Sequence, residues 1–292
     1  DAYELSKLNT NPNSNDTDGN GILDCDEDFD NDGLTNHNEY ICDTSPWVDD
    51  TDDDNLTDGE EIRYELFFNW KFIWIKAGEA TLTTHLTTYQ GAPAYESTLL
   101  ASTNQRADLI FRLRDTIRTV VTPEIVPLYF VKRCDEGKEM IYDRAWFDYG
   151  DGVCTARQTK IYDDGRVRET SFDDSRCIYD MVSLLLYSRS FDTDSLTIGQ
   201  QLQFPMVTGV RVEEQNLIYL GKKDVETLSG SIYRCQVFSL VQKKKNKDGE
   251  LEDREIIRFY TTDDEQHLPV QLDLILKFGV AKAKLASVRT EN

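Results

Sequence analysis

The chain of 292 residues has no run of 18 apolar residues, which is about the length that a helix needs to cross the hydrocarbon core of a membrane. The longest candidate, residues 64–77, is interrupted by four charged or polar side chains. We therefore expect no transmembrane segment in this sequence.

Histidine is scarce: the chain holds His37, His85 and His267. None of them lies in a Gly-x-Ser-x-Gly or similar nucleophile motif, and no phosphate-binding loop or dinucleotide fingerprint occurs. Acidic residues are too numerous for a pair of glycosidase carboxylates to stand out, and we expect Asp173-Asp174 and Asp263-Asp264 to serve as turn and cap residues. The sequence therefore predicts a protein that is not an enzyme, with a glycan-processing enzyme as an alternative.

Basic residues are almost missing from the N-terminal part of the chain. Residues 1–61 contain 20 Asp or Glu, one Lys and no Arg, a net charge of −19, whereas residues 62–292 carry 34 acidic and 31 basic residues. The first segment has too little apolar surface to form a core, so bound metal must replace one. We therefore expect two domains, residues 1–61 and 62–292. The acidic balance argues against nucleic acid and anionic membrane surfaces as partners.

No Cys-x-x-Cys pair occurs among the six cysteines, which argues against zinc and thioredoxin-like chemistry. Cys25 and Cys42 lie in the acidic segment, where a disulfide between them would close one turn of the chain. A disulfide and two free thiols are equally supported there. Free buried thiols and disulfides are also equally supported for the cysteines of the second part, which are Cys134, Cys154, Cys177 and Cys235.

Three stretches of the acidic segment place acidic or amide side chains at alternate positions: residues 16–21, 28–33 and 50–55. Each continues to an Asp or Asn at the ninth position and a Glu at the twelfth. Calcium takes about six to eight oxygen ligands, and a loop with oxygens at positions 1, 3, 5, 7, 9 and 12 supplies them. The spacing predicts calcium binding, in sites open enough to suit the millimolar calcium found outside the cytoplasm. A disordered acidic linker is the alternative.

These loops are not EF-hands, because the first ends at Glu27 and the second begins at Asp28, which leaves no residues for a helix between them. Residues 40–49 are rich in turn formers and have no helical period. We therefore expect an irregular chain wound around a row of metal ions.

The segment resembles thrombospondin type 3 repeats in their short bacterial form, with Asn11-Pro12 before the first loop and Asp58-Gly59-Glu60-Glu61 closing the third. The resemblance covers residues 1–61 and implies calcium-dependent structure in secreted or surface proteins, usually as a stalk or spacer. The chain begins in what looks like the tail of another acidic repeat and without a signal peptide, so we expect either that a signal and more repeats were removed or that the chain is a fragment.

By that pattern the expected calcium ligands occupy positions 1, 3, 5, 9 and 12 of each loop. They are Asp16, Asp18, Asn20, Asp24 and Glu27 in the first loop; Asp28, Asp30, Asp32, Asn36 and Glu39 in the second; and Asp50, Asp52, Asp54, Asp58 and Glu61 in the third. Asn55 stands where the other loops have Gly21 and Gly33, at a position that favours a left-handed turn. We therefore expect the third site to be the weaker one.

Residues 62–292 contain runs rich in β-branched and aromatic residues, which are typical of strands. We expect strands within residues 62–75, 80–89, 128–134, 139–149, 211–220, 231–242, 255–261, 268–276 and 280–288. Turns containing Asp and Gly separate several of these runs and favour hairpins, and residues 179–189 predict a buried helix of about three turns. The predicted fold is mainly β: an irregular calcium-wound stalk followed by a curved antiparallel sheet or partial β-barrel with one main helix.

The second domain also resembles an uncharacterised exported-protein family, known only as a domain of unknown function and frequent in Bacteroidetes-type bacteria. The matching stretches include Asn69-Trp70-Lys71, Ala77-Gly78-Glu79-Ala80, Asp180-Met181-Val182-Ser183 and Phe278-Gly279-Val280, and the match spans residues 62–290. The resemblance implies a curved antiparallel β architecture and a periplasmic or envelope location, and no known activity. No Gly/Ser/Pro linker precedes Tyr64, so the join is either a rigid natural transition or an artificial fusion.

Alternation is expected to place the aromatic side chains Phe68, Trp70, Phe72 and Trp74 on one face of a strand. They either pack in the core or line a half-open barrel that holds an apolar ligand. The basic run at residues 243–247 is expected to be a solvated hairpin tip, with a contact to the acidic stalk or to lipid head groups as the alternative.

The favoured function is therefore that of an exported, non-enzymatic protein, periplasmic, at the cell surface or secreted, whose calcium-rigidified stalk presents a β domain. The alternative is a periplasmic carrier of lipid or lipoprotein acyl chains in a half-open β-barrel. Calcium ions are the expected partners, with an apolar ligand or an envelope protein in addition.

Overall fold

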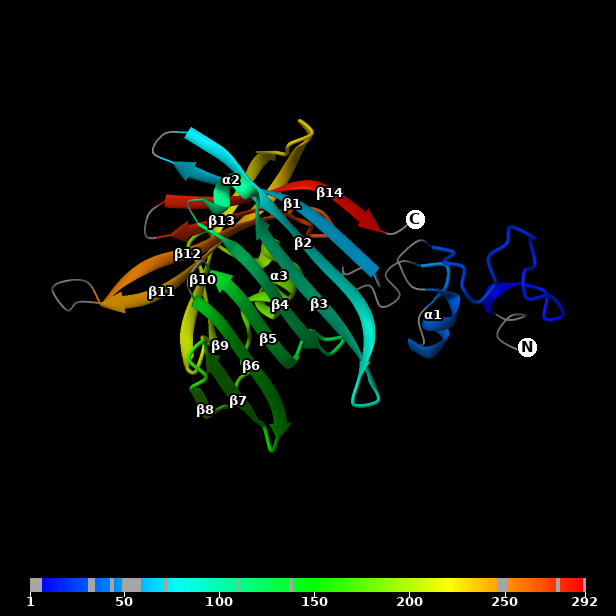
Figure 1. Cartoon of the computed structure of the whole chain (residues 1–292), viewed down its shortest axis with the longest axis horizontal. Coiled ribbons are helices and arrows are strands. Elements are labelled where there is room, and N and C mark those ends of the chain that lie inside the picture. The colour runs from blue at the N-terminus through cyan, green and yellow to red at the C-terminus, as the bar shows by residue number, and fades with distance from the viewer. Residues whose placement is uncertain are drawn as a thin grey trace.

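The computed structural model of the chain describes residues 7–30, 35–42, 45–48, 59–70, 73–109, 111–136, 139–245, 251–276 and 279–290. Most of them belong to the strands of a single sheet (Figure 1). The strands are β1 Gly59–Trp70, β2 Ile73–Tyr89, β3 Ala92–Thr103, β4 Leu113–Val121, β5 Pro127–Glu136, β6 Glu139–Gly150, β7 Val153–Tyr162, β8 Val167–Asp174, β9 Gln201–Val207, β10 Val212–Glu226, β11 Ile232–Lys245, β12 Leu251–Thr262, β13 Pro269–Leu276 and β14 Gly279–Thr290. The helices are α1 Asn36–Cys42, α2 Gln105–Asp108 and α3 Met181–Arg189, with a short 3-10 turn, η2, at Thr193–Ser195.

The sheet has 14 strands in the order β8-β7-β6-β5-β4-β3-β2-β1-β14-β13-β12-β11-β10-β9, and each neighbouring pair is antiparallel. Most neighbours are consecutive in the chain, because short hairpins join them. The turn between β2 and β3 illustrates why: Gln90 and Gly91 both have positive φ, at 53° and 85°, as a two-residue hairpin requires. The exception is β1, which pairs with β14 and so joins the two halves of the sheet.

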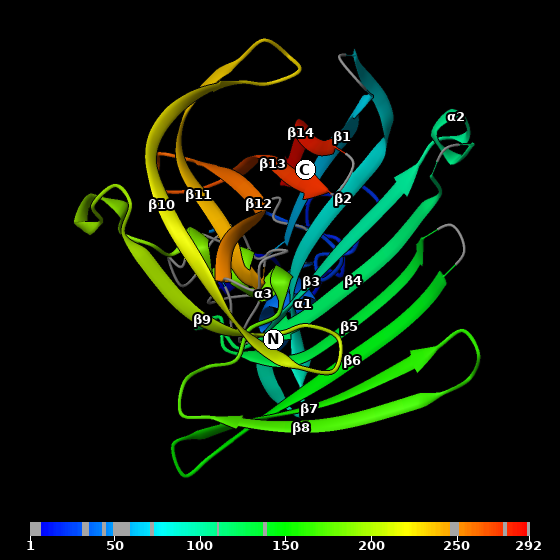
Figure 2. The same ribbon diagram turned by 90° about the vertical axis from the view of Figure 1, so that its left-hand side faces the viewer.

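The two edge strands, β8 and β9, approach each other through a seam of isolated contacts (Figure 2). The Thr170 hydroxyl in β8 donates to the carbonyl of Val210 at 3.2 Å. The Gln158 amide, oriented with its nitrogen toward the same turn, donates to the carbonyl of Gly209 at 2.8 Å. Tyr179 adds one parallel bridge to Met206 of β9. The sheet is therefore a nearly closed barrel whose last gap is spanned by side chains and a single bridge.

Helix α3 lies inside this barrel, with strands around it in Figure 2. Its side chains belong to all three buried apolar clusters: Val182 to one with residues from both halves of the sheet, Leu184 to one with residues of β9 to β12, and Leu186 to one with residues of β2 to β4. The aromatic ring of Tyr187 stacks on that of Tyr179 with 5.2 Å between the ring centroids. The helix thus serves as the centre of the core.

A buried carboxylate anchors the N-terminus of α3 to the barrel wall. Asp180 is fully buried and accepts hydrogen bonds from the backbone N–H groups of Val182 at 2.8 Å and Ser183 at 3.0 Å, which is the geometry of a helix N-cap. The Thr119 hydroxyl in β4 donates to the same carboxylate at 2.7 Å. A polar inner wall therefore fixes where the helix begins.

A buried ion pair anchors the C-terminal end of α3. The Arg189 guanidinium donates to Glu60 of β1 at 2.7 Å and 3.1 Å, and the two side chains are 2% and 5% exposed. Arg189 also donates to the carbonyl of Gln266 at 3.0 Å, and its own carbonyl contacts Nδ1 of His267. Both ends of the helix are therefore fixed to the barrel wall, by Thr119 of β4 at one end and by Glu60 of β1 at the other.

The predicted fold class is confirmed: the structure is mainly β, antiparallel and barrel-like, and the predicted helix appears as α3. Sequence reasoning missed β3, β4, β7, β8 and β9. In β3 and β4 the inward positions include Ser97 and Thr119, both fully buried, so the apolar alternation is interrupted. In β8 most side chains are exposed, because it is an edge strand.

Replacing Arg189 by Met should lower the free energy of unfolding by about 3–5 kcal/mol, because it leaves the Glu60 carboxylate buried without its cation. Urea unfolding followed by circular dichroism measures this change. The matched control is Arg166→Ala, since Arg166 pairs with Asp164 at the exposed tip between β7 and β8 and should contribute less than about 1 kcal/mol.

The double variant Glu60→Leu/Arg189→Met should recover much of the loss, because apolar replacement of both partners removes the unpaired buried charge. Equal stabilities for Arg189→Met and Arg166→Ala would show that the buried pair does not hold α3 in place.

Candidate functional site

The first acidic loop, residues 16–27, is organised by its own side chains. The carboxylate of Asp16 accepts hydrogen bonds from the backbone N–H of Gly19 at 2.7 Å and of Gly21 at 3.1 Å. Both glycines have positive φ, at 76° and 92°, where other residues are strained. The backbone therefore curls around Asp16, the residue at the first ligand position.

The loop closes between its fifth and twelfth positions. The Asn20 amide donates to Glu27 Oε1 at 2.7 Å, and the Asp18 carboxylate accepts from Asn20. Asp24, at the ninth position, is 4% exposed and accepts from the backbone N–H and the hydroxyl of Thr17, both at 2.8 Å. Side chains from every predicted ligand position thus take part in the fold of one small loop.

The second loop packs against the first through Asn36. Its backbone N–H donates to the carbonyl of Glu27 and its amide nitrogen to the carbonyl of Asp24, both at 2.7 Å. Asn36 and Glu39 are fully buried. The amide oxygen of Asn36 has no hydrogen-bond partner among the residues that the structure describes. An acidic, oxygen-rich segment therefore buries an unsatisfied acceptor where its two loops meet.

The side chains at the predicted ligand positions offer carboxylate and amide oxygens, which are the ligand atoms that calcium prefers. The residues present therefore fit the predicted ion. Within the described ranges, no group of three or more His, Cys, Asp or Glu side chains is gathered closely enough to hold a metal. The ligand assignments for Asp16, Asp18, Asn20, Asp24, Glu27, Asp28, Asp30, Asn36 and Glu39 accordingly stay predictions. Asp32, Asp50, Asp52, Asp54 and Asp58 lie outside the described residues, and Glu61 lies in β1, where it pairs with Arg63.

One local feature of the repeats differs from the sequence-based expectations. Residues 36–42 form the short helix α1, where the sequence predicted an irregular calcium loop through Glu39. Cys25 is a free, exposed thiol in the structure, and the side chain of Cys42 lies outside its described part.

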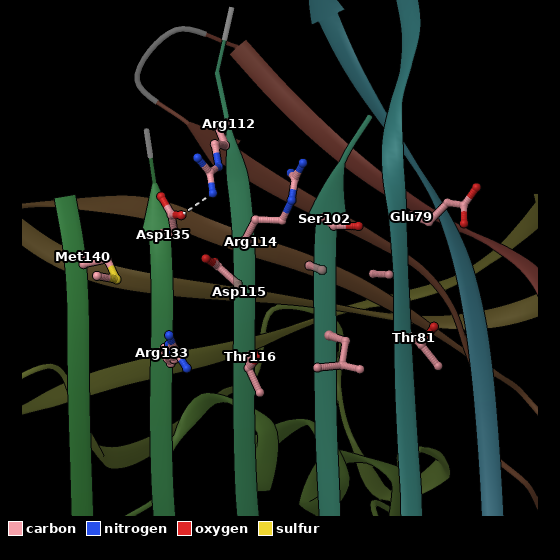
Figure 3. A pocket seen from close by; sticks show the side chains of 13 residues that line it. Glu79, Thr81, Ser102, Arg112, Arg114, Asp115, Thr116, Arg133, Asp135 and Met140 are labelled. Atoms are coloured by element: carbon pink, nitrogen blue, oxygen red, sulfur yellow. Dashed lines mark ion pairs between the residues drawn. The ribbon is translucent and has the colours of Figure 1, made fainter. Parts of the chain in front are cut away.

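A cavity of about 450 Å³ opens on the face of the sheet opposite α3 (Figure 3). Alternation defines the face: Ile117 and Thr119 of β4 point into the barrel, so Arg114 and Thr116 point outward beside Arg133 of β5. We call this cavity the outer groove. Its lining residues come from β2 to β6 and the connection before β4, and they are Glu79, Ala80, Thr81, Leu100, Ala101, Ser102, Arg112, Arg114, Asp115, Thr116, Arg133, Asp135 and Met140.

Two of the three arginines of the outer groove are held by carboxylates. Arg112 pairs with Asp135 at 2.8 Å, as Figure 3 shows, and Arg114 pairs with Asp108 of α2 at 2.7 Å. The hydrogen bond from Arg114, together with one from the Thr103 hydroxyl, holds the pKa of the Asp108 carboxyl below its usual value.

The third arginine, Arg133, is exposed and makes no ion pair or hydrogen bond within the described part of the chain. Leu100 and Met140 in the same groove are 48% and 55% exposed. The outer groove therefore combines one available guanidinium with two accessible apolar side chains.

The aromatic alternation expected for Phe68 and Trp74 is wrong. Phe68 stands opposite Ile75, and Trp74 stands opposite Asn69, so Phe68 and Trp74 lie on opposite faces of the β1–β2 hairpin. The reason is that the chain reverses between these residues rather than continuing as one strand. Trp74 is 43% exposed, and the Lys282 ammonium lies 5.1 Å from the centre of its ring.

The acidic pairs expected to act in turns and caps do so in part. Asp174 accepts from the backbone N–H and the guanidinium of Arg176 where the chain leaves β8, and Asp264 accepts from the Thr262 hydroxyl at 2.5 Å in the turn after β12. Asp173 is instead a strand residue of β8 and accepts from the Thr155 hydroxyl of β7 at 2.7 Å.

Two histidines lie in the barrel. His85 is exposed in β2. His267 contacts the side-chain amide of Gln236 at 3.2 Å, next to the α3 anchor.

Within the described residues, no helix combines the length and the apolar character that a membrane span requires.

Comparison with solved structures finds several chains that align with this one at low sequence identity. A β-barrel-like protein of the DUF1849 family from Brucella abortus has a TM-score of 0.47 at 10% identity, covering 79% of this chain and 96% of that one. A protein with a YmcC-like fold from Bacteroides fragilis has a TM-score of 0.29 at 9% identity, covering 80% and 96%. A DUF1089 family protein from Pseudomonas aeruginosa has a TM-score of 0.29 at 12% identity, covering 69% and 93%.

Among curated proteins, no relative matches the chain. A family described as "Protein of unknown function (DUF3108)" matches residues 63–286, which is most of the chain and nearly all of the barrel. The resemblance to an uncharacterised family is thereby confirmed, while the resemblance of residues 1–61 to thrombospondin repeats stays a prediction. On the evidence of that match and of the barrel that it covers, the chain belongs to the DUF3108 family.

Proposed function

We propose that this protein is an exported, non-enzymatic calcium-binding protein of the cell envelope, in which calcium rigidifies the acidic repeats and the repeats hold the barrel. The supporting observation is the amide oxygen of Asn36, which is fully buried between the first two loops and has no partner among the described residues. A buried acceptor without a donor or a cation costs about 1–3 kcal/mol. Calcium bound beside Asn36 would remove that cost and offset the repulsion among the neighbouring carboxylates.

The position of the repeats supports a role as a stalk. In Figure 1 the described part of the repeats lies beyond the start of β1, and the sequence before that strand contains no Gly- or Ser-rich linker. Calcium bound at Asp16, Asp18, Asn20, Asp24 and Glu27 would supply the order that this part of the chain cannot obtain from an apolar core. Extracellular modules of this type bind calcium with dissociation constants of about 10⁻⁴–10⁻³ M.

Calcium titration by calorimetry should show at least two sites, and the variant Asp16→Asn/Asp18→Asn should lose one of them or bind it at least about tenfold more weakly, because two carboxylate ligands are removed. The matched control is Asp26→Asn in the same loop, since Asp26 is exposed and occupies a position that supplies no ligand.

Removal of calcium by EDTA should also expose residues 1–61 to limited proteolysis while the barrel stays intact. If chelation alters neither the circular dichroism spectrum nor the protease sensitivity of this segment, the calcium stalk is refuted.

A second candidate function, a carrier for acyl chains, is favoured by the outer groove. Inside the barrel, α3 and its aromatic contacts occupy the space around the helix, whereas the outer groove is accessible to an amphiphile. We infer that the carboxylate or phosphate of such a ligand would bind the Arg133 guanidinium, which presents donors in a fork that matches these anions. The acyl chain would then lie along Leu100 and Met140.

Binding of oleate, measured by native mass spectrometry and by calorimetry, should weaken about tenfold in Arg133→Ala, because a charge-assisted pair is lost. Arg157→Ala is the control, since Arg157 points outward from the neighbouring strand β7 but pairs with Asp148 at 2.5 Å. Equal oleate affinity in the wild type, Arg133→Ala and Arg157→Ala would exclude the outer groove as the binding site.

A further inference from the structure

Two cysteines lie beside one tyrosine hydroxyl at the seam of the barrel. Tyr149 of β6 stands directly opposite Cys154 of β7, and its Oη lies 3.6 Å from Sγ of Cys177, which is in the segment between β8 and α3. The same hydroxyl donates its proton to the carbonyl of Pro127 at 2.8 Å. Because a phenol has one proton to give, the Cys177 thiol is the donor in its contact with Tyr149.

The course of the chain brings Cys177 back over Cys154. Cys154 pairs with Asp174, the last residue of β8 and three positions before Cys177. The chain then turns, and the backbone N–H of Tyr179 donates to the carbonyl of Pro205 at 2.9 Å. The chain on either side of Cys177 is therefore fixed, before it by the pairing of Asp174 with Cys154 and after it by the hydrogen bond of Tyr179 to Pro205 of β9.

The electrostatics of the two thiols show the same proximity. Burial raises the pKa of the Cys154 thiol, and a hydrogen bond with the backbone of Ile178, the residue after Cys177, partly offsets this rise. Burial also raises the pKa of the Cys177 thiol, and the charge of a Cys154 thiolate would raise it further. The Cys154 thiol therefore interacts with the residue next to Cys177, and the Cys177 thiol is close enough to feel the charge of a Cys154 thiolate.

We propose that Cys154 and Cys177 are a redox-sensitive pair that forms a disulfide when the protein meets a small-molecule disulfide oxidant. The location gives the bond a structural consequence. No backbone ladder joins β8 to β9, so the barrel is closed there by a few side chains and one bridge. A covalent bond from β7 to the segment that enters α3 would fasten this weakest side and close a loop of about 24 residues.

The reaction balances as two thiol–disulfide exchanges. Cys177, which is the more exposed of the two, loses its proton and attacks oxidised glutathione, forming a mixed disulfide and releasing one glutathione thiolate. Cys154 then loses its proton and attacks the Cys177 sulfur, releasing the second thiolate. The two cysteines are oxidised, one glutathione disulfide is reduced to two thiols, and the two protons pass to the released thiolates. Because the pKa of each thiol is raised, the rate should increase with pH above neutrality.

The test is to incubate the full chain with oxidised glutathione at pH 8, alkylate the remaining thiols in denaturant and map the peptides by mass spectrometry. The expected result is a cross-linked Cys154–Cys177 peptide and a melting temperature about 5–10 °C higher than that of the reduced chain. Cys134 and Cys235 should escape oxidation and be recovered in alkylated form, because both are fully buried and burial raises the pKa of Cys235 to about 12.

Variants separate the pair from nonspecific oxidation. In Cys154→Ser the Cys177 thiol should retain the glutathione adduct, and in Cys154→Ser/Cys177→Ser glutathione should leave the melting temperature unchanged. Recovery of Cys154 and Cys177 as separate alkylated or glutathionylated residues in the folded wild type would overturn the proposal. So would a bridge from either of them to Cys25. The wild-type peptide map requires no variant to fold, so the proposal stays testable even if the substitutions destabilise the barrel.

Discussion

The ion pair between Arg189 and Glu60 joins the C-terminal end of α3 to the first strand of the sheet, and both side chains are buried. A helix inside a barrel must bury the polar groups at both of its ends, and each unsatisfied group would cost free energy. Here Asp180 and Thr119 satisfy the N-terminal end, while Glu60 and the Gln266 carbonyl satisfy the guanidinium at the other. Because the partners come from β1, β4 and the connection before β13, the helix holds together strands from both halves of the sheet.

This anchor also lies where the repeats meet the barrel. Glu60 is adjacent to Glu61, the predicted twelfth-position ligand of the third loop, and both lie in β1. Glu60 faces the interior and Glu61 pairs with Arg63 on the other side of the strand. If the proposed third calcium site forms, its Glu61 ligand would connect the ion directly to β1, which joins the two halves of the sheet.

The fold class could be predicted from the sequence, because strands and hairpin turns have local signals. These signals are runs of β-branched and aromatic residues and turns that contain Gly. The sequence was a poor guide to β3, β4 and β7, where Ser97, Thr119 and Gln158 occupy buried inward positions and interrupt the alternation. Those polar residues are explained by partners that are distant in the chain, such as Asp180, and no local pattern reveals them. The calcium spacing was readable because its ligands are close in sequence. The outer groove could not be predicted from the sequence, because its residues come together only through the pairing register of five strands.

Helix α3 inside the barrel affects where an apolar ligand could bind. An apolar ligand at the position of α3 would have to displace the helix, which would separate Arg189 from Glu60 and expose an aromatic cluster built on Tyr187, Phe191 and Phe204. Breaking a buried ion pair alone costs about 3–5 kcal/mol, which is a large share of the stability of an ordinary domain. The outer face has no such cost, since the Arg133 guanidinium and the Leu100 and Met140 side chains are already exposed. The inner face of the sheet therefore provides stability through α3, and the proposed ligand would bind the outer face without disturbing that packing.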